Sequence, residues 1–352
     1  MTLKIALLGC GRIAQRHAEL LGQHHIQGAT LVSVCDIKKE KAEALANQYQ
    51  VPFYTDMHDM MKNESIDVVS VLTESGHHAR DVLALARYQK HLIVEKPMAL
   101  TVADADTMIQ ACQNHQIQLF VVKQNRFNVP VIQLRKALEQ KRFGRLLMGT
   151  VRVRWCRTQA YYDQDPWRGT WKLDGGVLTN QASHHIDLLE WMMGDVDKVF
   201  AKSKHSLAEI EAEDTAVVVM SFKNGALGVI EATTAVRPKD LEGSISILGE
   251  TGTVEIAGFA VNELKTWNFS NSGPEDENVL QRYSVNPPNV YGFGHKAYYD
   301  HVVSCLVDKK RPLVDGQEGK KSVELINAIY QSIETGQEVS LDKRPHVSLL
   351  GA

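Results

Sequence analysis

The chain has 352 residues, more than one hydrophobic core usually organises, so two domains are expected. A formal net charge of −3 argues against nucleic acid or an anionic membrane as the main partner, and 44% hydrophobic residues are typical of a globular protein. Five cysteines without CxxC spacing, and an apolar N-terminal run cut short by glycines, favour a reduced cytoplasmic protein without disulfides, export signal or membrane span.

Short apolar strands alternate with helical stretches through the first third of the chain. Strands are expected at residues 4–8, 30–35, 68–72, 91–94 and 119–122, and helices at 13–22, 39–49, 56–61, 78–87 and 102–115. These strands are apolar without alternation, as expected when both faces of a sheet are covered. The pattern predicts an α/β fold with a doubly wound parallel sheet, a Rossmann domain, over residues 1–124.

From residue 125 to 352 the pattern changes to polar and apolar residues in alternation. Strands are expected at residues 146–156, 198–205, 215–222, 226–232, 244–248 and 253–256, and helices at 131–140, 182–193, 296–307 and 318–333. This predicts an α+β domain with an open, mostly antiparallel sheet and helices on one face. Because the other face needs a cover, a homodimer or homotetramer formed through this sheet is expected.

A glycine motif, GCGRIA at residues 9–14, joins the first strand to the first helix. Gly9 suits a tight turn, and Gly11 would let the backbone approach a pyrophosphate at the helix N-terminus, where Arg12 and Ile13 begin the first turn. A lone match of this kind could also be an ordinary tight turn. The preceding strand and following helix favour dinucleotide binding.

An acidic residue supports the same interpretation. Asp36 ends the second strand about twenty residues beyond the glycine motif, where dinucleotide-binding folds place the partner of the adenosine ribose. A carboxylate there repels a 2′-phosphate and so favours NAD over NADP. Lys38 and Lys39 lie beside it and weaken that preference, because a basic residue could accept the phosphate.

The sequence Glu95-Lys96-Pro97 follows a predicted strand, at the carboxyl edge where open α/β sheets bind ligands. Lys96 there could hydrogen-bond a substrate hydroxyl and stabilise a developing alkoxide. A surface pair of Lys96 with Glu95 is the alternative, and position alone does not separate the two.

A second group of chemically active residues lies at 175–187. On a helix, Asn180, His184 and Asp187 would share one face, and histidine is the natural acceptor for an alcohol proton. His184 could equally be a core histidine. A metal site is disfavoured because asparagine is a poor ligand, and the pairs His24-His25 and His77-His78 are expected to be solvated.

Taken in order, these motifs and Thr73 resemble the Gfo/Idh/MocA oxidoreductases, and the likeness extends over essentially the whole chain. These are sugar and cyclitol dehydrogenases with a Rossmann domain and a sheet domain that commonly mediates oligomers. Four stretches resemble the members that oxidise the C3 hydroxyl of UDP-N-acetylglucosaminuronic acid in surface-polysaccharide and lipopolysaccharide synthesis: KQNRFN at 123–128, YYDQDPWRGTW at 161–171, LEGSISILGE at 241–250 and VYGFGH at 290–295.

The resemblance implies that Lys96 and His184 flank the reacting carbon and that Asn180 orients it, where many family members have aspartate. It implies an NAD site that contains Gly9, Gly11, Arg12, Ile13, Asp36, Thr73, Glu95, Lys96, Asn125, Trp167 and Arg168. The implied substrate site contains Lys96, Arg157, Tyr161, Tyr162, Trp171, Asn180, Gln181, His184 and Arg237.

The aromatic and basic string at residues 157–172 independently suits a nucleotide sugar. Arginine pairs with diphosphate and carboxylate, and flat aromatic rings stack on the base and the sugar. The alternative is an amphipathic loop that fixes the sheet domain. Two rival functions also stay open at this point: a family member acting on a free sugar or inositol, and a non-catalytic NAD-binding sensor, which would have no use for Lys96, Asn180 and His184 together.

Overall fold

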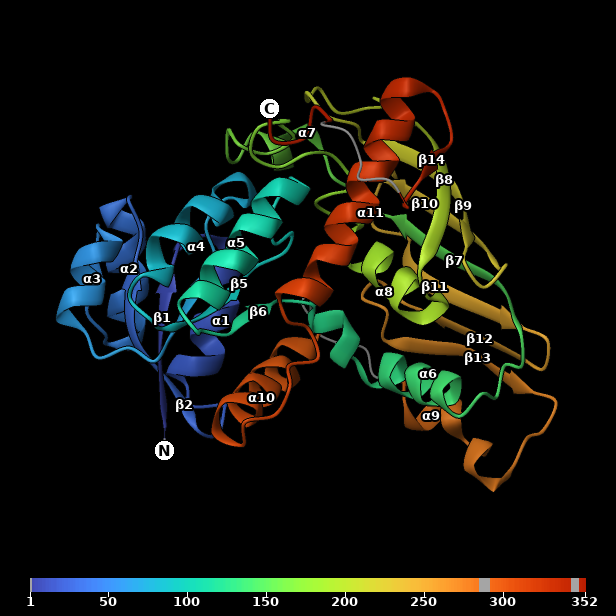
Figure 1. Ribbon diagram of the computed structural model, residues 1–352, viewed down its shortest axis with the longest axis horizontal. Coiled ribbons are helices and arrows are strands. Elements are labelled where there is room, and N and C mark those ends of the chain that lie inside the picture. Colours follow the sequence, from blue (N-terminus) through green and yellow to red (C-terminus); the bar gives the residue numbers. More distant parts are fainter. Residues whose placement is uncertain (1, 285–291, 343–347) are drawn as a thin grey trace. The chain divides into compact units, whose positions relative to one another are not determined.

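The computed structural model describes residues 2–284, 292–342 and 348–352 (Figure 1). The chain forms two compact units, and both are discontinuous in sequence. The first contains Met1–Lys123 and His295–Lys320, and the second contains Gln124–Gly294 and Lys321–Ala352. The first two residues of the VYGFGH stretch lie outside the described residues.

The first unit is built on a six-stranded parallel sheet in the order β3-β2-β1-β4-β5-β6. Its central strands are mostly apolar and buried, which agrees with a sheet covered on both faces. The order reverses between β1 and β4, the position at which such sheets bind ligands. The strands are β1 (Leu3–Leu8), β2 (Ala29–Cys35), β3 (Phe53–Tyr54), β4 (Val68–Val71), β5 (His91–Val94) and β6 (Leu119–Val121).

Helix ends in this unit show how the sequence defines its elements. Asp56 caps α3 by accepting from the backbone N–H groups of His58 and Asp59, and Thr101 caps α5 through Asp104. The helix α1 has no side-chain cap, which leaves its first N–H groups available to a ligand. The helices are α1 (Arg12–Gly22), α2 (Lys39–Tyr49), α3 (Met57–Asn63), α4 (His78–Ala86), α5 (Val102–Asn114) and α10 (Gly294–Val307), with the 3-10 turn η1 (Ser75–His77).

The second unit contains an eight-stranded sheet in the order β13-β12-β11-β7-β10-β9-β8-β14. All its neighbouring strands are antiparallel except β7 and β10, which pair in parallel, so the sheet is mostly antiparallel as predicted. The strands are β7 (Leu146–Arg154), β8 (Val196–Lys204), β9 (Thr215–Phe222), β10 (Leu227–Thr233), β11 (Glu242–Gly249), β12 (Gly252–Ala257), β13 (Glu263–Phe269) and β14 (Val339–Ser340).

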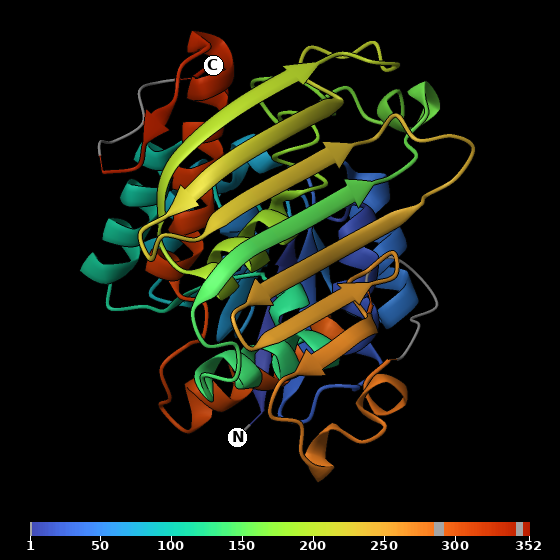
Figure 2. The ribbon, with the colours of Figure 1, turned by 90° about the vertical axis from the view of Figure 1, so that its right-hand side faces the viewer.

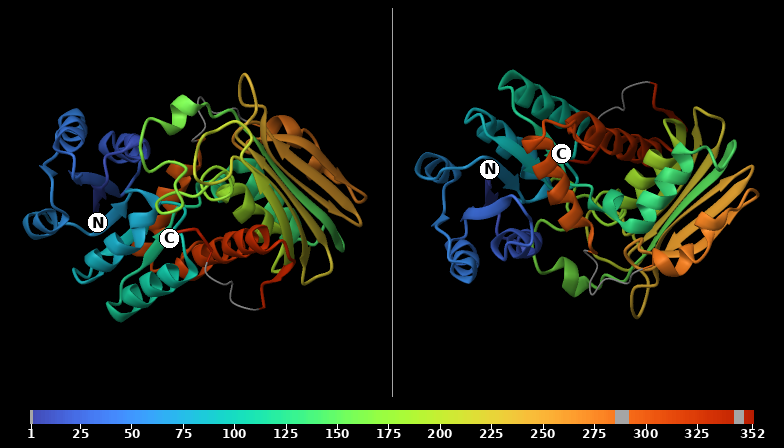
Figure 3. Two further views of the ribbon diagram at one scale, coloured as in Figure 1. Left: turned by 90° about the horizontal axis from the view of Figure 1, so that it is seen from above. Right: turned by 90° about the horizontal axis from the view of Figure 1, so that it is seen from below.

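One face of this sheet is covered by helices of its own unit, and Figure 3 shows the sheet nearly edge-on. The helix α8 packs on β7 and β11, and α11 reaches β8 through Ser332, whose hydroxyl accepts from the backbone N–H of Ala201 at 3.0 Å. Figure 2 shows the other face without helices. The helices are α6 (Val129–Glu139), α7 (Gln159–Tyr162), α8 (Ser183–Met193), α9 (Val279–Arg282) and α11 (Gly316–Thr335), with the 3-10 turns η2 (Gln124–Phe127) and η3 (Pro274–Asp276).

The fold class predicted from the sequence is confirmed for both sheets. Three edge strands were missed: β3 and β14 have only two residues each, and the longer β13 is mostly polar, so none of them carries a strong apolar signal. The helix expected at 296–307 is present, but its place in the first unit was not predicted. Within the described residues, no helix is both long and apolar enough to cross a bilayer.

Candidate active site

The loop between β1 and α1 contains two glycines, and glycine occupies each position for a different structural reason. Gly9 has φ +96°, and a Cβ there would lie 2.7 Å from the backbone carbonyl group of Leu72 on the neighbouring strand connection. A Cβ on Gly11 would meet nothing within 4 Å. The space in front of Gly11, together with the uncapped N-terminus of α1, fits a pyrophosphate group.

Asp36 lies at the end of β2, beside this loop. Its carboxylate accepts from the backbone N–H of Cys10 at 2.8 Å and from that of Lys38 at 2.8 Å. A carboxylate has about four acceptor positions, so two remain for a pair of ribose hydroxyls. Arg12 and Ile13 open α1 as expected, with the Arg12 side chain exposed. The residues of this edge therefore fit NAD.

The connections that follow β4 and β5 are joined by a buried histidine. One ring nitrogen of His78 lies 2.8 Å from the carbonyl oxygen of Pro97, and the other lies 3.0 Å from that of Thr73. Burial lowers the pKa of His78. The expectation that His78 is solvated was wrong, because its helix turns this side chain inward. The Thr73 hydroxyl donates to Asp81 at 2.7 Å.

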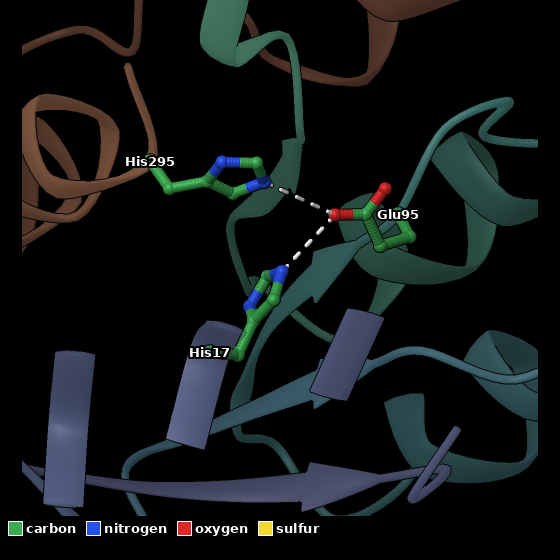
Figure 4. A group of neighbouring side chains, drawn as sticks. All are labelled: His17, Glu95 and His295. Atoms are coloured by element: carbon green, nitrogen blue, oxygen red, sulfur yellow. Dashed lines mark hydrogen bonds and ion pairs between the residues drawn. The ribbon is translucent and has the colours of Figure 1, made fainter. Parts of the chain in front are cut away.

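Glu95 is buried, and its carboxylate faces two histidines (Figure 4). Glu95 Oε1 lies 3.0 Å from His17 Nε2 and 3.9 Å from His295 Nε2. The other carboxylate oxygen accepts from the backbone N–H of Lys96 at 3.0 Å. Burial alone would raise the pKa of Glu95, but the hydrogen bond from His17 and the nearby imidazole of His295 hold it well below its usual range. A charged Glu95 thus fixes the main chain of Lys96.

The hydroxyl of Tyr299 continues this network, because it lies 2.6 Å from His17 Nδ1. A carboxylate only accepts, so His17 donates from Nε2 to Glu95 and accepts at Nδ1 from the tyrosine. Burial lowers the pKa of His17, in agreement with this neutral tautomer. The set of His17, Glu95 and His295 has ligand types suited to a metal ion, but the carboxylate already accepts from His17 and from the backbone N–H of Lys96. The contacts of these two histidines with Glu95 were not predicted, because both residues are far from Glu95 along the chain.

In the second unit Asn180 lies in the turn that precedes α8, so the prediction that it shares a helical face with His184 was wrong. The backbone of Asn180 donates to the carbonyl of Gly176 at 3.0 Å. Its side-chain amide donates to Asp174, whose other oxygen accepts from the backbone N–H of Gly169 at 2.8 Å. A turn held by hydrogen bonds, and not a helix, therefore orients the Asn180 carboxamide.

His184 lies in the first turn of α8 and is 8% exposed. Its Nε2 is 2.9 Å from the amide nitrogen of Gln124, a residue that the sequence analysis did not single out. Asp187, one turn further, forms a two-point ion pair with Arg126, with both N–O distances at 2.8 Å. Asp187 is thus a structural partner of a buried guanidinium.

Arg157, which was expected in the substrate site, and Arg168, which was expected in the NAD site, both lie against the ring of Tyr161. The guanidinium of Arg157 lies 5.5 Å from the centre of this ring, and that of Arg168 lies 4.8 Å from it. Arg237 donates to the backbone carbonyl of Arg157 at 3.1 Å. The Arg168 guanidinium also lies 4.6 Å from the centre of the Trp167 ring. The result is a cluster of aromatic rings and cations in one unit.

The remaining expected site residues differ in their surroundings. Tyr162 is buried, and its hydroxyl lies 2.9 Å from that of Thr234, which is a structural position. Gln181 is 5% exposed, and its carbonyl oxygen has no hydrogen-bond partner among the described residues. The ring of Trp171 packs edge-on against the core, whereas Asn125 is half-buried.

Comparison with known proteins agrees with this architecture. Residues 3–123 match the family model described as "Oxidoreductase family, NAD-binding Rossmann fold". Residues 135–341 match the model described as "Oxidoreductase family, C-terminal alpha/beta domain". Both are models of the Gfo/Idh/MocA family, and together they span most of the chain.

Similar solved structures include the WlbA dehydrogenase from Bordetella pertussis in complex with NADH and UDP-GlcNAcA, at 41% identity and a TM-score of 0.92, over 96% of this chain and 97% of that one. The WlbA dehydrogenase from Chromobacterium violaceum, in complex with the same two molecules, is 41% identical with a TM-score of 0.90, over 96% of each chain. The myo-inositol 2-dehydrogenase of Thermotoga maritima is 27% identical over 97% of this chain and 99% of its own length. The chain belongs to the Gfo/Idh/MocA family and is an NAD-dependent oxidoreductase.

Proposed function

We propose that the protein oxidises the C3 hydroxyl of UDP-N-acetylglucosaminuronic acid to the 3-keto sugar. The observation that carries this proposal is the 41% identity, over nearly the whole chain, to two dehydrogenases that bind NADH and UDP-GlcNAcA. The product would be ready for an aminotransferase in the synthesis of a surface polysaccharide such as lipopolysaccharide.

The arginine cluster supports a nucleotide sugar over a free sugar. A UDP-sugar acid carries a diphosphate and a carboxylate, which guanidinium groups bind by paired hydrogen bonds. Arg157 and Arg168 lie against one tyrosine ring, and Arg237 bonds to the same segment. Asp240 and Asp165 pair with Arg157 and Arg168 in this structure, and a free sugar or inositol has no anionic group that could replace these carboxylates.

We assign the chemistry to three residues of the chain. NAD, when bound, supplies the hydride acceptor, and oxidation of a carbinol also releases one proton. His184 accepts the hydroxyl proton, since imidazole titrates near neutral pH. Lys96 stabilises the developing oxyanion, where a fixed positive charge has its largest effect. The amide of Asn180 cannot act as an anionic base. We therefore assign Asn180 the task of orienting the carbinol.

Gln124 adds a constraint to this assignment. Its amide lies 2.9 Å from His184 Nε2, so one ring nitrogen of the proposed base is already engaged. We assign Gln124 the task of fixing the orientation of the imidazole ring. For Nδ1 to take the substrate proton, Nε2 must carry the ring hydrogen and donate it to the Gln124 carboxamide oxygen, so we assign the carboxamide that orientation.

We infer that the uncovered face of the second sheet binds a second copy of the chain. Leu227, Met148 and Leu248 form one row across β10, β7 and β11 and are exposed. Val217 and Val219 continue the apolar surface on β9. Light scattering on the purified protein tests this: a dimer or tetramer is expected, and a monomer at micromolar concentration contradicts it.

The five cysteines are free, which supports the cytoplasm as the location of the protein.

The deciding experiment is a single-turnover assay with NAD and UDP-N-acetylglucosaminuronic acid, which records nicotinamide absorbance and the mass of the sugar. Reduced cofactor and a sugar lighter by two hydrogens are expected. Single turnovers are needed because tightly held NADH would hide steady-state activity. The relationship to a myo-inositol 2-dehydrogenase makes inositol the comparison substrate. Reduction with inositol or free sugars alone would contradict the proposed substrate and leave the enzyme class intact.

A further inference from the structure

The turn at residues 175–179 ends at Asn180 and is held by a tyrosine from a distant helix. Tyr330, on α11, is 1% exposed. Its hydroxyl accepts from the backbone N–H of Gly176 at 3.2 Å and lies 3.0 Å from the hydroxyl of Thr179. One side chain therefore bonds to both ends of this turn.

Glu213 holds the same turn from another direction. Its Oε1 accepts from the backbone N–H of Leu178 at 3.0 Å and from the Tyr330 hydroxyl at 3.0 Å. The backbone carbonyl of Glu213 accepts from Val177 at 2.9 Å. A Cβ at Gly176 would overlap the carboxyl group and the carbonyl of Glu213, which explains the glycine. The turn thus packs directly against the Glu213 carboxyl group.

The surroundings of Glu213 favour its neutral form. The residue is 2% exposed, and Oε2 has no hydrogen-bond partner among the described residues. The ionisable groups that face it are Tyr330 and Asp174, and neither is a cation. Burial raises the pKa of Glu213 to about 7, and burial also raises that of Tyr330 well above its ordinary value.

We propose that Tyr330 and Glu213 are positioning residues for Asn180, and that Glu213 performs this task only while its carboxyl group is protonated. The protonated group accepts at Oε1 and carries its proton on Oε2. Ionisation would place a negative charge beneath the turn, without a cation among the groups that face it. The proposal rests on the role assigned to Asn180 in the proposed function.

The Glu213→Gln variant tests the proposal, because glutamine has a similar shape, keeps an acceptor at the position of Oε1 and a donor at that of Oε2, and does not titrate. Turnover of the wild type and the variant is compared between pH 6 and pH 8, so that titrations common to both cancel in the ratio. A group with a pKa of about 7 passes from about nine tenths to about one tenth protonated over this range. The ratio of kcat, variant over wild type, is expected to rise about tenfold, and a constant ratio overturns the proposal.

A thermal-unfolding series without ligand separates this test from the proposed function. The native pKa of about 7 exceeds the ordinary 4.5, so the native state binds more protons between these values and loses stability as the pH rises through them. The wild-type midpoint is expected to fall across this window relative to that of Glu213→Gln. Parallel curves would refute a protonated Glu213, whereas a lack of turnover with the UDP-sugar would refute only the proposed substrate.

Two further variants distinguish positioning from general stability. Tyr330→Phe removes the hydroxyl that bonds to the turn and is expected to lower kcat on the order of tenfold, with the NADH dissociation constant unchanged. Ser332→Ala is the matched control, because Ser332 is a buried hydroxyl on the same helix that bonds to Ala201 and Gln337, away from the turn. It is expected to lower the unfolding midpoint and leave kcat unchanged. Equal kcat for both variants would assign Tyr330 a merely structural role.

Discussion

Alanine substitutions at the two glycines of the first loop should separate folding from cofactor binding. At Gly9 a side chain meets the backbone carbonyl of Leu72 at 2.7 Å, and φ is +96°. The left-handed conformation costs alanine about 1–2 kcal/mol, and the overlap adds roughly 1–3 kcal/mol. Gly9→Ala should therefore lose about 2–5 kcal/mol of folding free energy, a fall on the order of 10 °C in the unfolding midpoint.

Gly11→Ala should behave in the opposite way. Its Cβ meets no protein atom within 4 Å, and its backbone is extended, with φ −76° and ψ −166°, which alanine adopts freely. The poorer helix cap costs a few tenths of a kcal/mol, and the stiffer unfolded chain offsets about as much. The new methyl group fills the space assigned to the pyrophosphate. The loss of one charge-assisted hydrogen bond of about 1.5–3 kcal/mol weakens NADH binding at least about tenfold.

Differential scanning fluorimetry without ligand and titration of NADH fluorescence measure the two effects separately. The expected result is a stable Gly11→Ala protein with weak NADH binding, beside an unstable Gly9→Ala protein. Unchanged NADH affinity in Gly11→Ala would refute the assignment of this space to the pyrophosphate. A normal unfolding midpoint in Gly9→Ala would refute the packing argument.

Three other substitutions test separate parts of the molecule. Lys96→Met should reduce turnover by orders of magnitude and leave NADH affinity nearly intact; full activity rules out its role as the oxyanion partner. His184→Asn should reduce single-turnover rates by about 10²–10⁴-fold, and an unchanged rate with bound cofactor shows that another group is the base. Asp187→Asn leaves Arg126, 2% exposed, without its charged partner. It should lower stability by roughly 3 kcal/mol in thermal unfolding, and an unaltered midpoint is inconsistent with a structural ion pair.

The sequence was sufficient for the parts of this molecule that depend on local pattern. Apolar runs predicted β1, β2, β4, β5 and β6 to within one residue at each end, because buried parallel strands have a strong composition signal. The glycine motif and the acidic residue after β2 also meet at one edge, as their spacing indicated. Asp36 is 26 residues from Cys10, but the strand–helix–strand pattern between them makes this contact predictable from the spacing.

Features that depend on long-range contacts could not be read in this way. His17 and His295 reach Glu95 from helices that are separated from it by many residues. Asn180 matched a helical spacing with His184, yet it lies in a turn that Tyr330 and Glu213 hold from distant parts of the chain. Tertiary contacts decided these positions, and a single sequence carries no signal for such pairs.

The discontinuity of the first unit has a consequence for how the protein is made. Residues 1–123 leave the ribosome long before His295–Lys320, which complete the same unit. Until then Glu95 lacks one of its two imidazoles, and the edge near Phe120 lacks its bridge to Asp315. An N-terminal fragment that ends at the first division would therefore be an incomplete nucleotide-binding module. Chimeras that exchange this module between relatives need to carry both segments.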